Sequence, residues 1–323
     1  MAAWKEIVDY TVPSNTTSVT LNNFGTITKD DFIKVTMSIV SNSTNPQKYG
    51  LYPNANTTET NYYHQRLIAE NSNVIAVREN RQYIGVLDEI TSIYISTLIK
   101  VSENNKFNLF SNFTATSSNV RNAFAYQTST IDFNNITSLL LNTSISNGIG
   151  AGSRIQIYKL TAKKVADITV TSNTTQVDIT ELDIKKGDEY LLVYSLNNLG
   201  SYSRYNLFVN NLEAENNYNV QRITGADTSF FSSRHSRATF ADIGNGMNVG
   251  YVHIKLSNTG AYTFQSYNNY RSSAESIHVI NWFGSSLSEN IQEIESLKII
   301  AISASAIQTN SRFELYKLYE GGN

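Results

Sequence analysis

Apolar and polar residues alternate along most of this chain, which is typical of β-strands with one face in a hydrophobic core. In VHIKLS (Val252 to Ser257), the valine, isoleucine and leucine fall on one side of an extended chain, and the histidine, lysine and serine fall on the other. Longer runs such as DDFIKVTMSIV (Asp30 to Val40) are rich in β-forming residues. We therefore predict an all-β protein built from antiparallel sheets.

The sequence contains one domain twice. VDYTVPSNTTSVTL, which starts at Val8, matches ADITVTSNTTQVDI, which starts at Ala166, at 8 of 14 positions with an offset of 158. SRIQIYKL at Ser153 and SRFELYKL at Ser311 match with the same offset. Such a duplication, with many short strands in each copy, predicts two tandem antiparallel β-sandwich domains of jelly-roll-like form, residues 1–162 and 163–323.

Two corresponding segments of the copies differ in whether their pattern suggests a helix. SENIQEIESL (Ser288 to Leu297) is the best match to a helical period, but its counterpart FNNITSLLL (Phe133 to Leu141) is not helical in pattern. We interpret this region as a strand preceded by a turn.

The closing SR-x-x-x-YKL pattern is present in both copies, which predicts an interior strand that completes each sandwich.

The segment LYPNANTTETNYYHQR (Leu51 to Arg66) matches LFVNNLEAENNYNVQR (Leu207 to Arg222) with an offset of 156. Because most of its residues are present in both copies, we interpret it as scaffold. It is expected to form a strand, a turn and a returning strand, in which Tyr62 is packed and Gln65 and Arg66 tie the hairpin together.

Only two positions of that segment are left for a contact specific to one copy. Tyr63 and His64 are replaced by Asn219 and Val220 in the second copy. These two residues are therefore candidates for contact with a receptor or partner.

Composition narrows the function classes. Charged residues make up only 16% of the chain, the net charge is −2, and there are 20 tyrosines. Nucleic-acid binding would need a basic excess, so it is not expected. There is no basic amphipathic or long apolar segment, so no membrane contact is expected. The chain has no cysteine, and the N-terminal residues carry no run of signal-peptide character.

No motif for catalysis or cofactor binding is present. The four histidines are too scattered for a zinc site, and there is no nucleophile elbow or phosphate-binding loop. Carboxylate pairs for glycoside hydrolysis are defined by spatial separation, which the sequence does not give. We expect a non-enzymatic protein without metal or cofactor, and we do not expect a depolymerase.

Two clusters of basic and aromatic residues lie in polar stretches of the second copy, SSRHSR (Ser232 to Arg237) and SYNNYRSS (Ser266 to Ser273). Such residues can stack on sugars and donate adaptable hydrogen bonds, pack against another subunit, or simply form surface. The candidate contact residues here are Arg234, His235, Arg237, Tyr267, Tyr270 and Arg271.

The two copies resemble a β-sandwich module of tailed-bacteriophage structural proteins, including head fibres, collar and tail appendages, and receptor-binding components. The resemblance covers nearly the whole chain and is carried by NYYHQ (Asn61 to Gln65) and GSRIQIY (Gly152 to Tyr158). The second copy departs from these motifs at Asn219 and Asn310. The resemblance implies a virion protein assembled in the host cytoplasm.

The leading expectation is a virion structural component that self-associates or docks on other virion proteins. We expect a homo-oligomer, with a trimer favoured over a dimer, because sheet edges in a chain with little charge and three prolines need covering. The alternative is a carbohydrate- or receptor-binding protein that recognises host-surface glycans through loops rich in Tyr, Asn and Arg.

Overall fold

The computed structural model describes residues 3–43, 45–70, 73–87, 92–116, 120–198, 200, 202–226, 228–271, 277–286 and 291–320. These residues form β-strands, two short 3-10 helices and connecting turns, with no α-helix among them. The chain divides into two compact units, one composed mainly of Trp4–Leu160 and the other mainly of Thr161–Thr224 and Phe231–Asn323.

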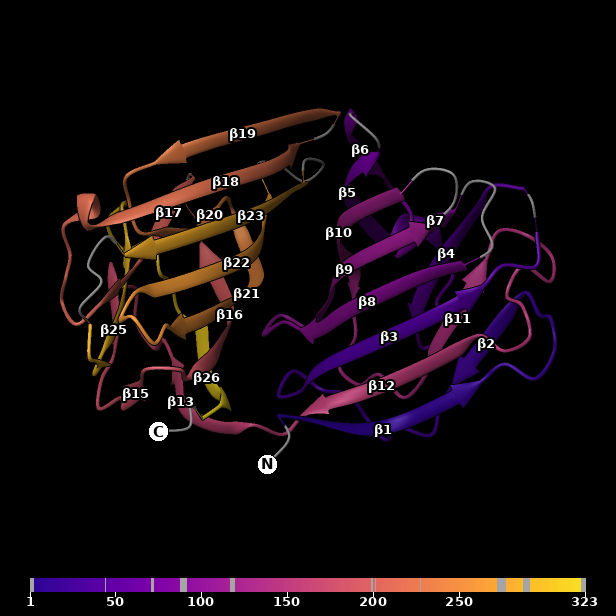
Figure 1. Cartoon of the computed structure of the whole chain (residues 1–323), viewed down its shortest axis with the longest axis horizontal. Coiled ribbons are helices and arrows are strands. Elements are labelled where there is room, and N and C mark those ends of the chain that lie inside the picture. The colour runs from indigo at the N-terminus through magenta and orange to yellow at the C-terminus, as the bar shows by residue number, and fades with distance from the viewer. Residues whose placement is uncertain are drawn as a thin grey trace. The chain divides into compact units, whose positions relative to one another are not determined.

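The first domain is a sandwich of two antiparallel sheets (Figure 1). The large sheet has the order β1-β12-β3-β8-β9-β10-β5-β6. Its strands are β1 (Trp4–Thr11), β12 (Arg154–Leu160), β3 (Phe32–Val40), β8 (Ser92–Val101), β9 (Lys106–Thr116), β10 (Val120–Asp132), β5 (Tyr62–Glu70) and β6 (Asn73–Glu79). The small sheet contains β2 (Ser18–Leu21), β11 (Leu139–Thr143), β4 (Gln47–Pro53) and β7 (Gly85–Leu87), in that order.

The second domain repeats this arrangement strand for strand. Its large sheet contains β13 (Lys163–Thr169), β26 (Arg312–Tyr319), β16 (Glu189–Asn198), β21 (Gly246–Leu256), β22 (Tyr262–Arg271), β23 (Ile277–Ser286), β18 (Tyr218–Ala226) and β19 (Ser229–His235), in that order. Its small sheet contains β14 (Gln176–Ile179), β25 (Leu297–Ala301), β17 (Ser203–Val209) and β20 (Thr239–Ile243). A two-stranded ribbon pairs β15 (Ile184–Lys185) with β24 (Glu293–Ile294).

The strand order is that of a jelly roll with two insertions. In the first domain the chain alternates between the sheets, so that β1, β12, β3 and β8 of one sheet are matched by β2, β11, β4 and β7 of the other. This is the eight-strand, double Greek-key arrangement. The hairpins β5–β6 and β9–β10 are inserted into it and extend the large sheet beyond β8. The predicted all-β fold of tandem jelly-roll-like sandwiches is confirmed.

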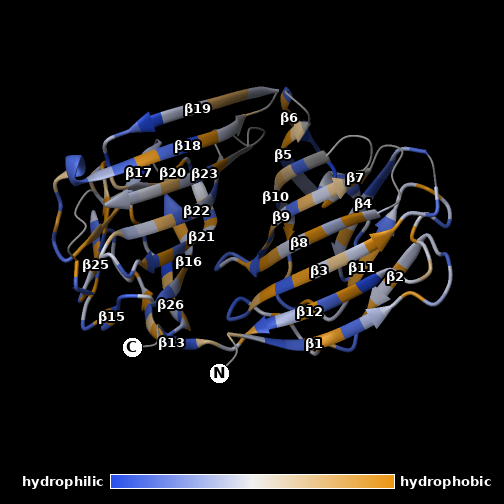
Figure 2. Ribbon diagram, viewed as in Figure 1, coloured by the Kyte–Doolittle hydropathy of each residue, from blue (hydrophilic) through white to orange (hydrophobic). Residues whose placement is uncertain are grey.

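Each sandwich has its own hydrophobic core, and no residue belongs to both core clusters. Strand β21 illustrates the alternation, because Val252, Ile254 and Leu256 are buried in the core while the residues between them face the other way. The same alternation of hydrophobic and hydrophilic positions runs along the strands of both domains in Figure 2. The period of two in the sequence therefore identified the core-facing side of this strand correctly.

The closing strands β12 and β26 are interior, as predicted, since β12 lies between β1 and β3 and β26 lies between β13 and β16. The serine at the start of each closing strand is fully buried. Its hydroxyl accepts a hydrogen bond from a backbone N–H of the neighbouring strand, from Val40 to Ser153 at 3.0 Å and from Asn197 to Ser311 at 2.9 Å. This bond explains why serine is present in both copies, because it satisfies a backbone donor of the neighbouring strand in a part-buried position.

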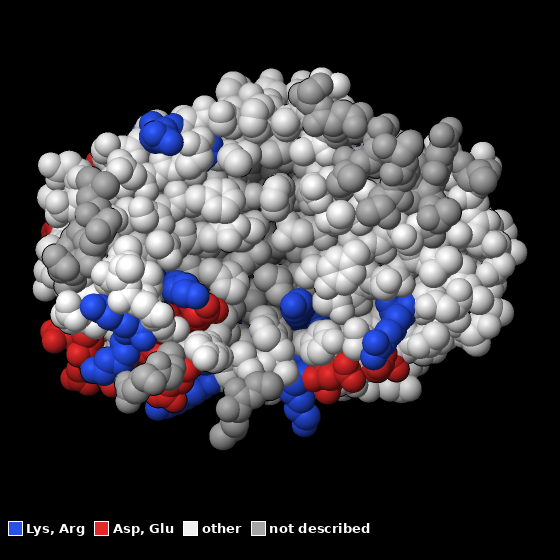
Figure 3. All heavy atoms as spheres, viewed as in Figure 1, with Lys and Arg blue, Asp and Glu red and all other residues white. Residues whose placement is uncertain are grey.

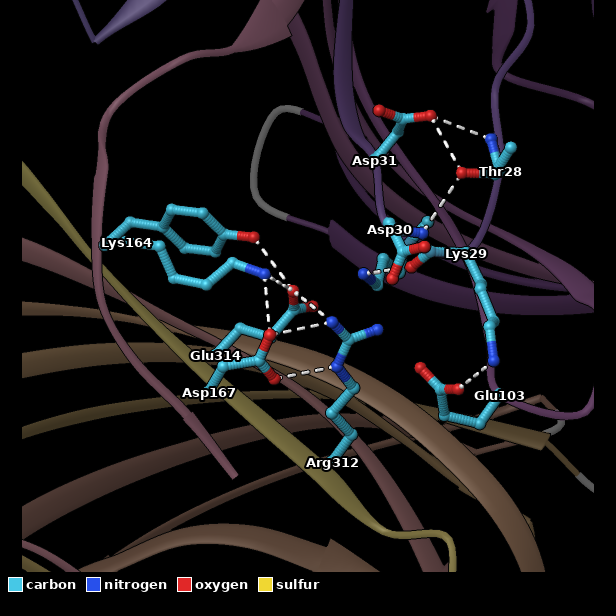
Figure 4. Close-up of polar contacts among 11 residues, drawn as sticks. Thr28, Lys29, Asp30, Asp31, Glu103, Lys164, Asp167, Arg312 and Glu314 are labelled. Atoms are coloured by element: carbon cyan, nitrogen blue, oxygen red, sulfur yellow. Dashed lines mark hydrogen bonds and ion pairs between the residues drawn. The ribbon is translucent and has the colours of Figure 1, made fainter. Parts of the chain in front are cut away.

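The lysine near the end of each closing strand anchors a turn. Lys159 forms an ion pair with Asp31, and Lys317 lies 3.4 Å from the carboxylate of Asp188. Asp31 also accepts a hydrogen bond of 2.9 Å from the backbone N–H of Thr28, which closes the turn before β3 (Figure 4). The repeated Lys and Asp residues thus fix the entry of one strand against the end of another.

The interpretation of Leu51 to Arg66 as a hairpin was wrong. β4 belongs to the small sheet and β5 to the large one, so the segment carries the chain from one sheet to the other. Tyr62 is buried, as predicted, and its hydroxyl donates to the carbonyl of Asn56 at 2.8 Å. Asn54 adopts a left-handed backbone with φ of 49° and donates a side-chain hydrogen bond to the carbonyl of Asn135. The segment is part of the structural framework, as a connection between the two sheets and not as a hairpin.

The described part of SENIQEIESL is extended, in agreement with the predicted strand. Residues 291–297 contain β24 and the start of β25, and residues 288–290 lie outside the described part. The change from Gly152 to Asn310 between the copies also has a simple reason. Both residues have positive φ, 84° and 67°, in the region that glycine and asparagine tolerate best.

Candidate functional site

The second domain contains a groove of about 810 Å³ on the face of its large sheet that points away from the core. All of its lining residues belong to this domain. The central strands contribute Glu189 from β16, His253 and Lys255 from β21, and Thr263 and Gln265 from β22. The size is within the range of small-molecule sites, which is roughly 300–1,000 Å³.

The far side of the groove is formed by the inserted hairpins of the jelly roll. Phe283 and Ser285 come from β23, Asn219 and Gln221 from β18, and Arg234 from β19. Phe283 is 37% exposed, so part of its ring is accessible from the groove. The groove therefore combines one aromatic ring with amide, hydroxyl and charged groups, a mixture suited to a polar ligand with some apolar surface.

Sheet register explains how these side chains converge. His253, Gln265 and Phe283 are directly opposite one another on three neighbouring strands. Lys255, Thr263 and Ser285 form a second such row. Side chains at paired positions of adjacent strands project from the same face, about 5 Å apart, so the two rows form a continuous surface.

A glycine lies beneath the groove. Gly284 faces the core side of β23, opposite Phe264. A Cβ atom at this position would lie 2.3 Å from the Phe264 ring, so the ring can lie against this strand only because residue 284 is glycine. The core side below the groove is therefore tightly packed while the outer side is hollowed.

The charges in the groove are unevenly paired. The Nζ atom of Lys255 lies 2.7 Å from a carboxylate oxygen of Glu189. Arg234 is exposed and forms no hydrogen bond or ion pair with any residue that the structure describes. Glu189 is the only carboxylate among the residues that line the groove, so they supply no carboxylate pair of the kind that glycosidases use.

Of the residues predicted from the sequence, Arg234 is the one that lines this groove. The cluster SSRHSR does not act as one patch, because neighbouring residues of a strand point to opposite faces. His235 lies on the other face of β19, with its ring 6.4 Å from that of the buried Trp282. Burial, together with the nearby Arg237, lowers the pKa of His235.

Arg237 follows β19 and is half-buried. Burial lowers the pKa of its guanidinium, and the positive charge of Arg204 lowers it further. The adjacent Arg222 pairs with Asp242 at 3.0 Å and lies 5.6 Å from the Trp282 ring. His235 and Arg237 therefore belong to a polar cluster at the rim of the sandwich and not to the groove.

Tyr267 lies beside the groove. Its hydroxyl accepts a hydrogen bond from Gln265, a lining residue, and its ring stacks on Tyr251 with centroids 4.8 Å apart. Burial raises the pKa of Tyr267, so its hydroxyl is neutral at physiological pH. By backbone, Tyr270 and Arg271 are in β22, but their side chains lie outside the part that the structure describes.

The expectation of a surface contact at His64 is corrected by its position. His64 is 1% exposed, and its ring lies edge-on to Tyr83 at 6.1 Å. Neither ring nitrogen has a hydrogen-bond partner among the described residues, and burial holds the pKa of His64 well below its usual value. Tyr63 is half-buried on the other face of β5, so the pair does not form one contact site.

Sequence reasoning missed most of the groove. One signal was available, because the polar side of VHIKLS contains His253 and Lys255. However, the register that aligns these residues with Gln265 and Phe283 depends on which strands become neighbours. A period of two gives the face on which a residue lies but not the strand beside it.

Among the described residues, no group of His, Cys, Asp or Glu could hold a metal ion. Likewise, none of the helices found in the described part is long and apolar enough to cross a bilayer.

No protein-family model and no curated protein matches the chain. Among solved structures, the chain is similar to the LG4-5 domains of the mouse laminin alpha1 chain, with 9% identity and a TM-score of 0.21 over all of this chain and 92% of that one. It is also similar to a tesB protein of Mycobacterium avium subs paratuberculosis, with 7% identity and a TM-score of 0.16 over 72% of this chain and 81% of that one.

Proposed function

We propose that this protein is a non-enzymatic structural component of a tailed-bacteriophage particle, as a fibre, a collar or tail appendage, or a capsid-attached protein. The observation that carries the proposal is the duplication of one complete jelly roll. The residues at the start of the closing strand form the same hydrogen bonds in both copies, through Ser153 and Arg154 in the first and Ser311 and Arg312 in the second. A duplicated, self-contained sandwich is suited to act as a spacer and an outer domain. The resemblance of the NYYHQ and GSRIQIY segments to phage modules points the same way.

The surface chemistry supports a structural role. On the face shown in Figure 3, most of the surface is uncharged, and in its lower part Lys and Arg side chains lie close to Asp and Glu side chains, while a basic group near the upper edge has no acidic neighbour on this face. A surface of this kind is neutral and rich in hydrogen-bonding groups, so it can dock on other proteins without strong charge repulsion. Other virion proteins or further copies of this chain are the proposed partners.

Purified particles provide the test. Mass spectrometry of density-banded virions should detect the protein at a fixed ratio to the major capsid protein, and labelled antibody should decorate one position on the particle. Detection in infected-cell lysate but not in banded particles would overturn the proposal. Addition of purified protein to particles that lack it separates true docking from co-purification.

A second function, recognition of a host-surface glycan, is favoured by one specific observation. The groove of the second domain presents Phe283 beside amide and hydroxyl groups, which is the combination that binds sugars. A glycan array probed with the full chain tests this function, with Phe283→Ala as the variant that should lose binding. The virion role does not depend on the result.

A further inference from the structure

We propose that the groove of the second domain binds a saccharide that carries a carboxylate, with Arg234 holding the acid and Phe283 stacking on a sugar ring. This inference rests on the glycan-binding function proposed above and names the class of ligand. It uses three observations, which are the difference between the two copies, the unpaired charge in the groove and the position of the aromatic ring.

The first domain has apolar and aromatic residues at the equivalent place on its large sheet. Leu98, Phe110 and Tyr126 form a cross-strand row on β8, β9 and β10, at the place where the second domain has His253, Gln265 and Phe283. The Phe110 and Tyr126 rings lie 5.0 Å apart and are almost completely buried.

Polar side chains have replaced two members of that row in the second domain. The aliphatic Leu98 corresponds to His253 and the aromatic Phe110 to Gln265, while the position of Tyr126 keeps an aromatic residue, Phe283. Because both domains keep the same strand order, the difference does not follow from the fold. It is a copy-specific surface, as expected of a binding site that only one domain carries.

The charges select an acidic ligand. Lys255 is neutralised by Glu189, whereas Arg234 has no partner among the described residues. A guanidinium presents a planar pair of N–H donors that matches a carboxylate, so a uronic or sialic acid carboxylate would complete the charge balance of the groove. A neutral sugar would leave Arg234 without a counter-charge in the complex.

The remaining lining groups suit the rest of a sugar. Phe283 offers an exposed ring face on which the apolar side of a pyranose can stack. Asn219, Gln221, Thr263 and Ser285 offer donors and acceptors for hydroxyl groups. The volume of about 810 Å³ leaves room for a short oligosaccharide and not only for a single acid group.

Isothermal titration calorimetry on the full chain tests the inference with two matched probes. Tetragalacturonate carries four carboxylates, and its fully methyl-esterified form has the same sugar rings without charge. Hyaluronan and colominic acid oligosaccharides extend the acidic set, and a neutral cello-oligosaccharide extends the uncharged set. At least one acidic probe should bind, and the methyl ester should bind at least tenfold more weakly than tetragalacturonate if that is the acid bound.

Variants assign the effect to the groove. Arg234→Gln should weaken binding of the acidic probe at least tenfold and remove most of its salt dependence. Arg78→Gln, at the same edge-strand position of the first domain, should leave it unchanged. Phe283→Ala should weaken binding without changing the salt dependence, because stacking involves no net charge.

The outcomes separate the two proposals. Binding of a neutral probe that depends on Phe283 but not on Arg234 would overturn the acidic class and keep glycan recognition. Failure of every acidic and neutral probe to bind would overturn both. Acid binding that Arg234→Gln does not change would place the acid elsewhere and overturn this assignment.

Discussion

The guanidinium of Arg312 forms two parallel contacts with the carboxylate of Asp167, Nε to Oδ1 at 2.9 Å and Nη2 to Oδ2 at 2.8 Å. The same two-point pair joins Arg154 to Asp9 in the first domain, with Nε to Oδ1 at 2.8 Å. Each pair links the first strand of a jelly roll to its last strand, so the two ends of the domain are held in register. The hydrogen bonds from Arg312 hold the pKa of Asp167 well below its usual value.

Only the second domain extends this pair into a buried network. Glu314 is 2% exposed, and its carboxylate lies 2.7 Å from Nζ of Lys164 and 3.3 Å from Nη2 of Arg312 (Figure 4). Burial by itself would lower the pKa of Lys164, but its hydrogen bonds to Asp167 and Glu314 outweigh burial and raise it. In the first domain, Gln156 and Glu6 occupy the places of Glu314 and Lys164 and share one hydrogen bond of 2.8 Å.

Replacing Glu314 by Gln should therefore destabilise the second domain. The substitution removes the buried carboxylate and leaves Lys164 and Arg312 paired with Asp167 alone, so we expect a loss of about 1.5–3 kcal/mol, the range for hydrogen bonds to charged groups. Chemical denaturation followed by circular dichroism measures the loss. The double variant Lys164→Glu/Glu314→Gln, which recreates the pair of the first domain, should recover most of it. A loss below about 1 kcal/mol in the single variant would contradict the expected role of this network.

His64 should make the first domain sensitive to mild acid. Its pKa in the folded protein is well below the value of 6.5 in the unfolded chain, because burial disfavours the charged ring. Above pH 6.5 both states are neutral. As the pH falls below 6.5, the unfolded chain takes up a proton that the folded one does not, so stability is lost, by up to about 1.4 kcal/mol per pH unit.

The matched control for His64 is already present in the chain, because the second domain has Val220 at this position. In His64→Val, the difference in unfolding free energy between pH 7.5 and pH 5.5 should shrink relative to the wild-type protein. The variant should also be more stable at pH 7.5, since it removes two buried ring nitrogens that have no partner among the described residues. Identical pH profiles for the two proteins would contradict the burial of a neutral imidazole.

Each domain should fold on its own. The two core clusters share no residue, and each contains strands from both sheets of its own jelly roll. Residues 1–162 and 163–323, expressed separately, should each show a β-rich circular dichroism spectrum and one cooperative unfolding transition. A fragment that stays unfolded while the full chain folds would show that its core needs the other domain.

Self-association should proceed through the edge strands of the large sheets. β6 and β19 each lie at the end of their sheet, and both carry an exposed apolar pair at the same repeat position, Val74 and Ile75 in one and Phe230 and Phe231 in the other. Such edges favour pairing with another chain. Sedimentation at micromolar concentration should give an oligomer, with a trimer favoured over a dimer.

A lysine on each edge strand tests this surface. Ile75→Lys combined with Phe231→Lys should weaken association at least tenfold, because a charge on an edge strand opposes strand pairing. Tyr94→Lys, at an exposed position on an interior strand, is the control and should have little effect. A wild-type protein that remains monomeric at all concentrations would contradict self-association, although docking on another protein would remain possible.

Much of the fold was accessible from the sequence. The repeated segments predicted a duplicated domain, the alternation of VHIKLS predicted strands, and the closing SR-x-x-x-YKL pattern predicted an interior strand. The reason is that these are local properties, since burial of one face imposes a period of two wherever the strand lies. The burial of Tyr62 was predicted for the same reason, from a position kept in both copies.

The errors concerned which elements meet in space. Tyr63 and His64 were grouped as one contact because both differ between the copies, but adjacent residues of a strand lie on opposite faces and His64 points inward. Arg234 and His235 were also predicted to belong to one contact cluster, but as neighbours in β19 they lie on opposite faces of the sheet. The residues that the two copies share between Leu51 and Arg66 predict a hairpin, whereas the two strands of this segment belong to different sheets.

The sequence by itself determined the duplication, the strand content and the core-facing side of its clearest strands, because these depend on spacing along the chain. The tertiary structure alone decided the register that places Phe283 beside Gln265 and His253, and the insertion of two hairpins that brings Arg234 to the same face. Those contacts join residues on different strands, and the free energy that selects one neighbour over another comes from packing of the whole sandwich and not from any single segment.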